Sequence, residues 1–382
     1  MILWHKLRLK SKNPQIRRNA VECLATANCV ESVELLVPCL CDKDAMVRRA
    51  AARAFHTITD ERAINSLISA LADTNSDVRA TVASALGRQG DLRSITPLVR
   101  TLRDGKSRVR RCAAASLRKL GWKPGNKEEH AVYEVALGNP SAAVRSGKEA
   151  VGPLAGELSS DTSCFRRAVA EALKDVHDPR AAKSLLNAAK SDSDVNVRVT
   201  AIYALAELED KEVIPMLEMG LGASDSHVRL AAVQVLAQRA NDSHIPKFLE
   251  LLKDNHFELR LAAVKFVAKL HDPKYAEALL PLLWDPDHDV REVAAKALGS
   301  LRSAAALEPL VVALIDEEHS VRKAAERALQ QIDQRWMFSE AAQRAKAQLE
   351  LSANDNRSWV RSATMMLLKK LNHAPEAARI HA

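Results

Sequence analysis

One short step, an apolar residue followed by arginine, recurs along this 382-residue chain at a nearly constant interval. The arginines are Arg17, Arg48, Arg79, Arg110, Arg166, Arg198, Arg229, Arg260, Arg291, Arg322 and Arg361. Subtracting each of these numbers from the next gives 31, 31, 31, 56, 32, 31, 31, 31, 31 and 39. Such a fixed period predicts an array in which one supersecondary unit is repeated and each copy packs on the next.

Each copy contains two stretches with helical patterning. Small or apolar residues follow Val290 at positions i+3, i+4, i+7, i+8 and i+11, which places them on one face of a helix, here called helix B. The segment YAEALLPLLW (275–284) upstream is also apolar at helical spacing and predicts helix A. Aromatic residues make up only 4% of the chain, and abundant alanine and leucine favour closely packed helices. The repeating unit is therefore predicted to be a helical hairpin.

Aspartate and proline mark helix A. Asp178-Pro179 and Asp272-Pro273 each combine an N-cap residue with a proline in the first turn. A further proline follows within many copies of helix A, and we expect an interior proline to bend the helix at that point. These prolines are Pro97, Pro153, Pro215, Pro246 and Pro309.

The bent helix A, the Asp-x5-Arg spacing and the phrase VRxxAAxAL at the start of helix B resemble the HEAT-repeat family. The short period and LGWKP (120–124) are most similar to the bacterial and archaeal repeats named after phycobilisome lyases. The resemblance implies an all-α, right-handed superhelical solenoid of about eleven two-helix repeats. It also implies a hydrogen-bonded ladder of aspartate and arginine between successive repeats. The matching positions are Asp42/Arg48, Asp73/Arg79, Asp104/Arg110, Asp192/Arg198, Asp254/Arg260, Asp285/Arg291, Asp316/Arg322 and Asp355/Arg361.

Three copies lack the aspartate and carry Ser11, Ser160 or Ala223 instead. We expect a weaker ladder there, with Asp225 as a partial substitute for the missing carboxylate beside Ala223. The long gap before Arg166 predicts a helical insert over residues 122–147, in which Val144-Arg145 imitates the repeated step. Four parts are predicted: basic repeats at 1–121, the insert as a joint, a second repeat block at 148–335, and an atypical capping repeat at 336–382.

Positive charge is concentrated in residues 1–121, which contain 22 Lys and Arg against 11 Asp and Glu. The rest contains 56 − 22 = 34 against 48 − 11 = 37, so its balance is −3 within a total of +8. Two interpretations remain open: ladder arginines with a solvated face, or a docking stripe for an acidic protein or a phosphate backbone. Few aromatic rings accompany the charge, which favours a protein over nucleic acid. The candidate partner-binding residues are Arg18, Arg49, Arg53, Arg108, Arg111, Arg118 and Lys119.

The sequence offers little for catalysis or cofactor binding. The six cysteines form no C-x-x-C pair, and we interpret them as small core residues, because Cys23 aligns with Ala54 and Ala85. The histidines His227, His256, His288 and His319 fall in A-to-B turns one repeat apart, too far apart to share a metal ion. Deoxyhypusine hydroxylases are enzymes built from HEAT-like repeats, and their di-iron site resembles paired His-Glu steps. This sequence contains no His-Glu dipeptide. We therefore expect no catalytic residue, metal or cofactor.

These patterns together predict a non-catalytic scaffold that binds a protein partner. A bilin lyase-like or lyase-associated subunit is an alternative that rests only on the repeat type. The sequence contains no run of eighteen apolar residues, so we expect no membrane-spanning helix. The segment MILWHKLRLK (1–10) lacks the features of a secretory signal. A cytoplasmic protein is expected, in an oligomeric state that the sequence does not specify.

Overall fold

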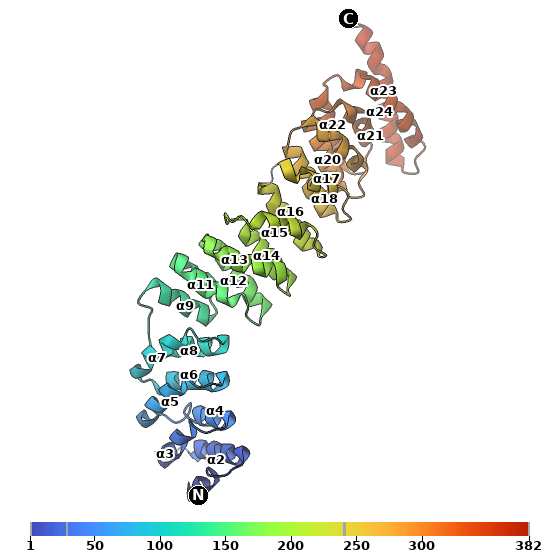
Figure 1. Cartoon of the computed structure of the whole chain (residues 1–382). Coiled ribbons are helices and arrows are strands. Elements are labelled where there is room, and N and C mark those ends of the chain that lie inside the picture. The colour runs from blue at the N-terminus through green and yellow to red at the C-terminus, as the bar shows by residue number, and fades with distance from the viewer. Residues whose placement is uncertain (1, 28–29, 240–241, 381–382) are drawn as a thin grey trace. The chain divides into compact units, whose positions relative to one another are not determined.

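The protein, seen in a computed structural model, is helical throughout the residues that the structure describes, 2–27, 30–239 and 242–380. Helices follow one another in A and B pairs along the chain (Figure 1). The B helices are α2 (Pro14–Ala27), α4 (Ala45–Ala54), α6 (Ser76–Gln89), α8 (Ser107–Lys119), α12 (Ser163–Val176), α14 (Val195–Leu205), α16 (Ser226–Arg239), α18 (Phe257–Lys269), α20 (His288–Ser300), α22 (His319–Ile332) and α24 (Ser358–Ile380).

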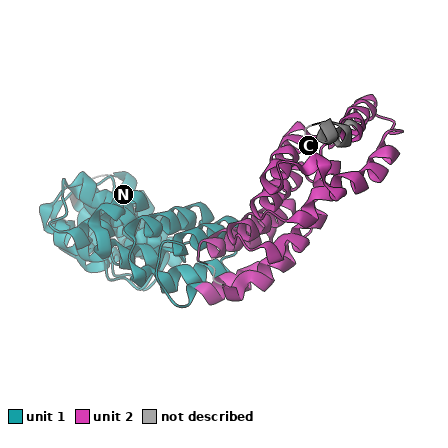
Figure 2. Ribbon diagram, turned by 90° about the horizontal axis from the view of Figure 1, so that it is seen from above, with its two compact units in different colours: residues 1–213 teal, residues 214–382 magenta. Residues whose placement is uncertain are grey.

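The A helices are α1 (Ile2–Arg8), α3 (Val30–Cys39), α5 (Ile64–Ala70), α7 (Ile95–Thr101), α11 (Val151–Glu157), α13 (Ala182–Ser191), α15 (Val213–Leu221), α17 (Ile245–Leu251), α19 (Ala276–Leu279), α21 (Leu307–Ala313) and α23 (Glu340–Ser352). In the described part of the chain they make eleven pairs with the B helices, which confirms the predicted all-α repeat architecture. The chain divides into two compact units, residues 1–213 and 214–382, coloured separately in Figure 2.

Helix A begins with a 3-10 turn in most repeats. In the fourth repeat, Asp91 caps η2 (Leu92–Ser94) by accepting a hydrogen bond from the Arg93 amide, and α7 continues directly from η2. The expected interior prolines lie early in the α-helical segment of helix A, and a bend at them stays a prediction. Pro97 is the third residue of α7, in the first turn of the α-helical segment, where a backbone donor is not needed. Equivalent prolines stand second or third in α11, α15, α17 and α21.

Adjacent B helices approach closely, and glycine permits the closest contact. A Cβ atom built at Gly87 of α6 would lie 2.8 Å from the Cα of Ser116 in α8. The Ser116 hydroxyl in turn donates a hydrogen bond of 2.8 Å to the carbonyl of Ala83. Gly299 of α20 stands at the same repeat position and would meet the Cα of Ala328 at 2.7 Å. Glycine at this position therefore permits the close approach of α6 to α8 and of α20 to α22.

The ladder joins successive repeats through one carboxylate. Arg48 donates through Nε and Nη2 to the carboxylate of Asp73, 25 residues ahead, at 2.5 and 2.9 Å. Its Nη1 donates to the backbone carbonyl of Asp42 in its own repeat, at 2.8 Å. Arginine and aspartate of one repeat are thus linked through the aspartate backbone, and the ion pair points to the next repeat. We call each such arginine–carboxylate pair a rung.

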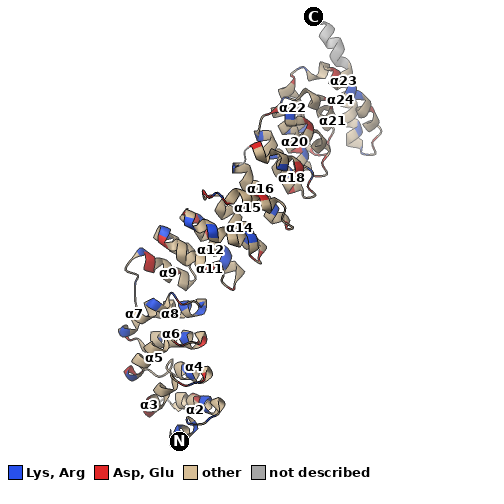
Figure 3. Cartoon of the chain, in the orientation of Figure 1, with Lys and Arg blue, Asp and Glu red and all other residues tan. Residues whose placement is uncertain are grey.

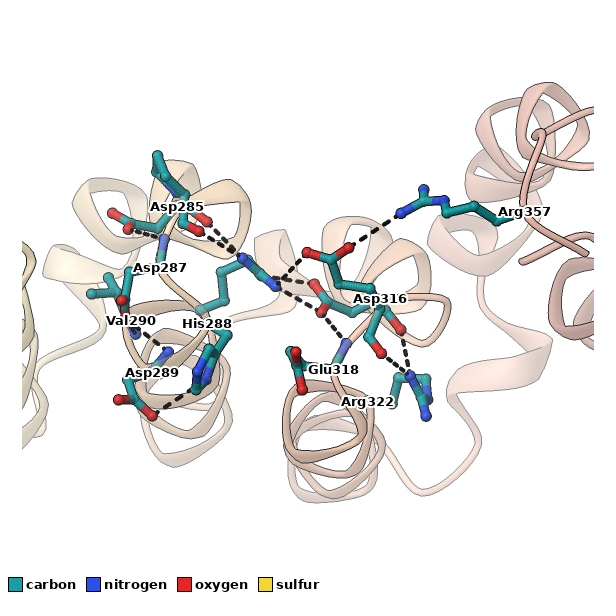
Figure 4. Close-up of polar contacts among 12 residues, drawn as sticks. Asp285, Asp287, His288, Asp289, Val290, Asp316, Glu318, Arg322 and Arg357 are labelled. Atoms are coloured by element: carbon teal, nitrogen blue, oxygen red, sulfur yellow. Dashed lines mark hydrogen bonds and ion pairs between the residues drawn. The ribbon is translucent and has the colours of Figure 1, made fainter. Parts of the chain in front are cut away.

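Further rungs have the same geometry. The two hydrogen bonds of each measure between 2.6 and 3.0 Å in the pairs Arg17–Asp42, Arg79–Asp104, Arg166–Asp192, Arg260–Asp285 and Arg291–Asp316. Arg229 and Asp254 are farther apart, at 3.7 Å. The guanidinium of Arg291 donates to the carbonyl of Asp285 and to the carboxylate of Asp316; both aspartates are labelled in Figure 4. Two-pronged charged bonds of this kind fix the register of neighbouring hairpins.

Ser160 stands where other repeats carry the ladder aspartate, but the ladder is not interrupted at the insert. Arg110 pairs with Glu157 of α11, a carboxylate three positions before Ser160 and only 5% exposed in its side chain. Arg166 uses the Ser160 carbonyl at 2.8 Å, as other arginines use the aspartate carbonyl. The ladder therefore crosses the insert through a residue that the repeat pattern does not indicate.

The ladder changes character near the end of unit 2. Asp355 accepts two hydrogen bonds from Arg357, two residues away, at 3.0 Å each. This pairing lowers the pKa of Asp355 to about 2. The guanidinium of Arg322 lies 5.4 Å from the centre of the Trp359 ring instead, within the range of a cation–π contact.

The predicted insert contains α9 (Lys127–Leu137), α10 (Pro140–Ala143) and a 3-10 segment, η3 (Val144–Ala150). Its helix α9 packs on α8, and α10 packs on α12. Tyr133 of α9 contacts Trp122 edge-on at 5.4 Å and belongs to the same hydrophobic core as the first repeats. Arg145 is exposed in η3 and outside any B helix, so this step is no repeat anchor. The insert's role as a joint stays a prediction.

Candidate functional site

A groove of about 950 Å³ lies over the B helices α2, α4, α6 and α8 of the basic block. Three arginines border it: Arg49 and Arg53 from α4, and Arg108 from α8. The lining is completed by Glu22, Ala25, Thr26, Ala50, Ala54, His56, Thr57, Ala80, Thr81, Ser84 and Cys112. We call this feature the α4–α8 groove. All of it lies within unit 1.

A change of residue size between neighbouring repeats creates the hollow. Ala80 and Ser84 of α6 follow Arg49 and Arg53 of α4 by one repeat period each, so they occupy equivalent helix positions. Long side chains therefore stand on α4 where α6 carries an alanine and a serine. The space left beside the two arginines forms the groove, and Arg108 borders it on the next helix.

Carboxylates near the groove neutralise only part of this charge. Asp77 at the start of α6 lies 2.8 Å from Nη1 of Arg108 and 4.0 Å from Nη1 of Arg49. Arg53 is exposed, and no carboxylate of the described residues lies within ion-pair distance of its guanidinium. Figure 3 shows the positions of basic residues along α2, α4, α6 and α8, with acidic residues among them. The groove keeps an excess of positive charge.

His56 follows α4 and lines the groove. Burial lowers the pKa of His56 below its usual value, a hydrogen bond with the Thr81 backbone opposes this, and the charges of Arg88, Lys119 and Arg53 lower the pKa further. His56 is consequently neutral near neutral pH. The charges of Arg88, Lys119 and Arg53 thus all act on this point of the groove.

The predicted partner-binding residues separate into different places. Arg49, Arg53 and Arg108 meet in the α4–α8 groove, and the charge of Lys119 acts there on His56. Arg18 pairs with Glu22 of its own helix at 2.8 Å. Arg111 lines a smaller hollow with Val135 and Phe165, and the charge of Arg118 acts on Tyr133 of α9. Partner binding by any of them remains a prediction.

The sequence interpretation missed the small residues of the groove. Ala80, Thr81 and Ser84 carry no charge and attracted no attention, yet they define the hollow. Comparing equivalent positions one repeat apart would have revealed the loss of two arginines on α6. His56 and Cys112 were likewise not connected with the basic residues.

Burial of the cysteines was predicted wrongly for three of the five that the structure describes. Cys39 is buried, and desolvation raises the pKa of its thiol to about 11. Cys23, Cys41 and Cys164 are exposed, and Cys29 lies outside the described residues. Cys23 stands at the position that faces the preceding B helix in later repeats, as Ser116 does. It is exposed because α2 is the first B helix of this chain.

The four turn histidines are all exposed, at the starts of α16, α18, α20 and α22. Within the described ranges, no group of three or more His, Cys, Asp or Glu is placed to hold a metal ion. His177 and His271, which precede the Asp-Pro steps, adopt positive φ angles of 52° and 50° and end their helices in the left-handed conformation. His177 and His271 therefore have a structural role, because they end the B helix of their repeats.

One cluster outside the groove imitates a hydrolase triad. His130 Nδ1 lies 2.9 Å from the Ser146 hydroxyl, and His130 Nε2 lies 4.0 Å from Glu134. The order of nucleophile, base and carboxylate is that of a Ser-His-Glu site. Ser146, however, is only 1% exposed, so a substrate cannot reach its hydroxyl. The arrangement holds α9 against η3.

No helix in the described part of the chain is both long and apolar enough to cross a bilayer. None of the curated proteins matches the chain. Three solved structures are similar at low identity. An engineered protein is 22% identical, with 87% of this chain and 98% of that chain covered and a TM-score of 0.39. Escherichia coli YibA is 18% identical, with 76% and 98% covered and a TM-score of 0.41.

Human deoxyhypusine hydroxylase, solved in complex with glycerol, is 20% identical, with 87% and 96% covered and a TM-score of 0.29. The family model for HEAT repeats matches residues 4–80, 64–151, 151–236, 220–299 and 282–369. These matches extend over nearly the whole chain and agree with the paired helices and their regular period. The chain belongs to the HEAT-repeat family.

Proposed function

We propose that the protein is a non-catalytic scaffold that binds an acidic protein partner through its N-terminal basic block, residues 1–121. The observation that carries this proposal is the α4–α8 groove. Three arginines border about 950 Å³ of open space, and Glu22 is the only acidic residue among the described residues that line it. Clustered charge of one sign attracts a partner of the opposite sign and speeds its capture.

A protein partner fits this surface better than nucleic acid. Apart from the His56 imidazole, none of the described residues that line the groove carries an aromatic ring, whereas single strands are usually held by stacking on aromatic side chains. Glu22 and Asp77 among the arginines would repel a continuous phosphate backbone. A protein segment can place its own carboxylates opposite the arginines and neutral residues opposite Glu22.

The absence of catalysis is also part of the proposal. HEAT repeats generally mediate protein interaction, and the family resemblance supplies no catalytic residues that match this sequence. The nucleophile–base pair noted above is buried at its serine. An extended surface made from many similar helices suits binding, because its variable positions can select a partner.

Charge reversal along the basic block tests the proposal. Proteins captured from the source cell by the wild-type chain are compared with those captured by the triple variant Arg18→Glu, Arg49→Glu and Arg111→Glu. The matched control reverses Lys265, Lys269 and Lys323, which are exposed in unit 2. We expect the control to retain an acidic partner that the first variant loses. Equal capture by both variants would count against docking on the face that carries Arg18, Arg49 and Arg111.

A further inference from the structure

We infer that the α4–α8 groove is the docking site itself and that its occupant is an acidic segment of a partner polypeptide. Carboxylates of this segment bind Arg53 and compete with Asp77 for Arg49 and Arg108. This inference rests on the proposed function and makes it specific. It names the site within the basic block, the chemistry of the occupant and the internal group that opposes binding.

Asp77 shows how the groove holds a carboxylate. The two oxygens of Asp77 contact two helices at once, with Oδ1 at 2.8 Å from Arg108 and Oδ2 at 4.0 Å from Arg49. The side chains of Asp77, Arg108 and Arg49 are 46%, 64% and 36% exposed. Exposed pairs of this kind are weak and exchange readily with competing carboxylates. Asp77 is therefore an internal competitor for an external acidic ligand.

Arg53 differs from Arg49 and Arg108, which both pair with Asp77. Within the described residues no carboxylate lies within ion-pair distance of Arg53, and it is exposed at the groove wall. The charges of Arg88 and Lys119 act on the neighbouring His56, so positive potential is not confined to one side chain. A carboxylate entering here gains an unshared arginine, and no existing bond must be broken first.

The floor suits a polypeptide. Ala50, Ala54 and Ala80 line the groove with small apolar side chains, and Thr57 and Ser84 supply hydroxyls that can bond to backbone amides. A volume of about 950 Å³ is at the upper end for small-molecule sites and accommodates several residues of an extended chain. The combination of small apolar lining residues and a basic border favours a segment in which acidic and small residues are interspersed.

Binding of a fluorescein-labelled peptide of alternating glutamate and alanine to the full chain tests the inference. Anisotropy measured at low salt should show that Arg53→Ala weakens binding about 3- to 10-fold, since one arginine–carboxylate contact is lost. Asp77→Asn should strengthen binding about 2- to 5-fold, because Arg49 and Arg108 lose their competitor. A merely structural role for Asp77 would not produce tighter binding.

Two further variants separate the groove from charge in general. Arg118→Ala removes the same charge as Arg53→Ala from a side chain near α9 and should leave peptide affinity within about twofold of wild type. Ser84→Met changes no charge but fills the hollow on α6, and it should weaken binding about 3-fold or more. Circular dichroism checks that each variant retains its helices.

Three results would overturn the inference. The first is equal weakening by Arg53→Ala and Arg118→Ala, which would leave the proposed basic block intact but place docking outside the groove. The second is failure of the wild-type chain to bind the peptide, or of Asp77→Asn to tighten it. The third is tighter binding of a single-stranded oligothymidylate than of the peptide, which would make the ligand a phosphate backbone and would count against the proposed function as well.

Discussion

Replacing Asp73 with asparagine removes the charge from one rung while keeping its shape. In the wild-type chain the Asp73 carboxylate accepts from Nε and Nη2 of Arg48 at 2.5 and 2.9 Å. Its Oδ1 also accepts from the Asn75 amide at 2.8 Å. Asparagine retains one oxygen for these donors and places an amide donor against the guanidinium. The arginine keeps its bonds to the carbonyls of Asp42 and Lys43.

The expected loss can be estimated from burial and bond type. The side chains of Arg48 and Asp73 are 14% and 6% exposed, so water replaces the lost contact only in part. Hydrogen bonds to charged groups contribute about 1.5–3 kcal/mol each, and neutral ones about 1 kcal/mol. Exchanging two charged bonds for at most one neutral bond, with some hydration of Arg48, should cost about 2 kcal/mol. A local loss of this size corresponds to about 30-fold faster opening.

Native-state hydrogen exchange followed by mass spectrometry measures this locally. Full unfolding of a repeat array is not a two-state process, so a single denaturation curve would mix several transitions. Peptides from α4, α5 and α6 should exchange about 30-fold faster in the variant, whereas peptides from unit 2 should be unchanged. Glu128→Gln is the matched control, because the Arg103–Glu128 pair is 64% and 58% exposed and should contribute less than about 1 kcal/mol.

A change of less than about threefold in α4–α6 would refute the reasoning that buried rungs hold successive repeats together. An equal acceleration in both units would refute the nearest-neighbour character of the coupling. Either result would mean that apolar packing between helices, and not the ladder, determines local stability.

Three further predictions follow from the same contacts. Gly87→Ala should lower the melting temperature of unit 1 by a few degrees in calorimetry, because overpacking against α8 costs about 1–3 kcal/mol and outweighs the better helix propensity of alanine; an unchanged or higher value would contradict the close approach. Burial would raise the pKa of Asp42 and Asp104, but hydrogen bonds from arginine outweigh it and lower both. The rungs should therefore stabilise the fold above about pH 4 and lose this contribution as the pH falls further, and stability independent of pH in acid would contradict this. Limited proteolysis should cut first in the exposed turn near Lys123 or Lys127, with trypsin acting at Lys127 because Pro124 protects the bond after Lys123, and first cleavage within residues 198–322 would count against a weak joint there.

Repetition made most of the fold predictable from the sequence. The regular spacing of the arginines identifies every B helix, because the same local pattern must satisfy the same packing in each copy. The helical character of residues 122–147 was likewise predicted, and α9 lies within this range. Comparing equivalent positions between repeats is less informative for the first repeat. Cys23 aligns with buried alanines, but it lacks the preceding B helix that buries them.

Departures from the repeat were harder to predict because their partners lie outside the pattern. Glu157 replaces the missing aspartate from one turn earlier in α11, which requires knowing how the insert positions that helix. Trp359 contacts Arg322 because Arg357 already occupies Asp355. The division of the chain after Val213 was not predicted either. This boundary falls ten residues before Ala223, which stands where other repeats carry the ladder aspartate.

The candidate groove was predictable only in its charges. Clustering of arginine in residues 1–121 was visible, and three of the seven candidate residues line one hollow. The hollow depends on the difference in side-chain volume between the arginines of α4 and the equivalent small residues of α6. A count of charges contains no information about this difference. The contact of Asp77 with two helices depends on the spacing between B helices, and this spacing is a property of the packed array.

A double-mutant cycle on Arg110 and Glu157 tests most directly whether an arginine–carboxylate rung holds successive repeats together, even across the insert. Arg110→Met, Glu157→Gln and the double variant are compared by hydrogen exchange in α8 and α12. The account predicts a coupling of about 1.5 kcal/mol or more, similar to the coupling of Arg48 with Asp73, because both side chains are less than one-fifth exposed. Additive effects of the two single variants, with no coupling, would contradict it.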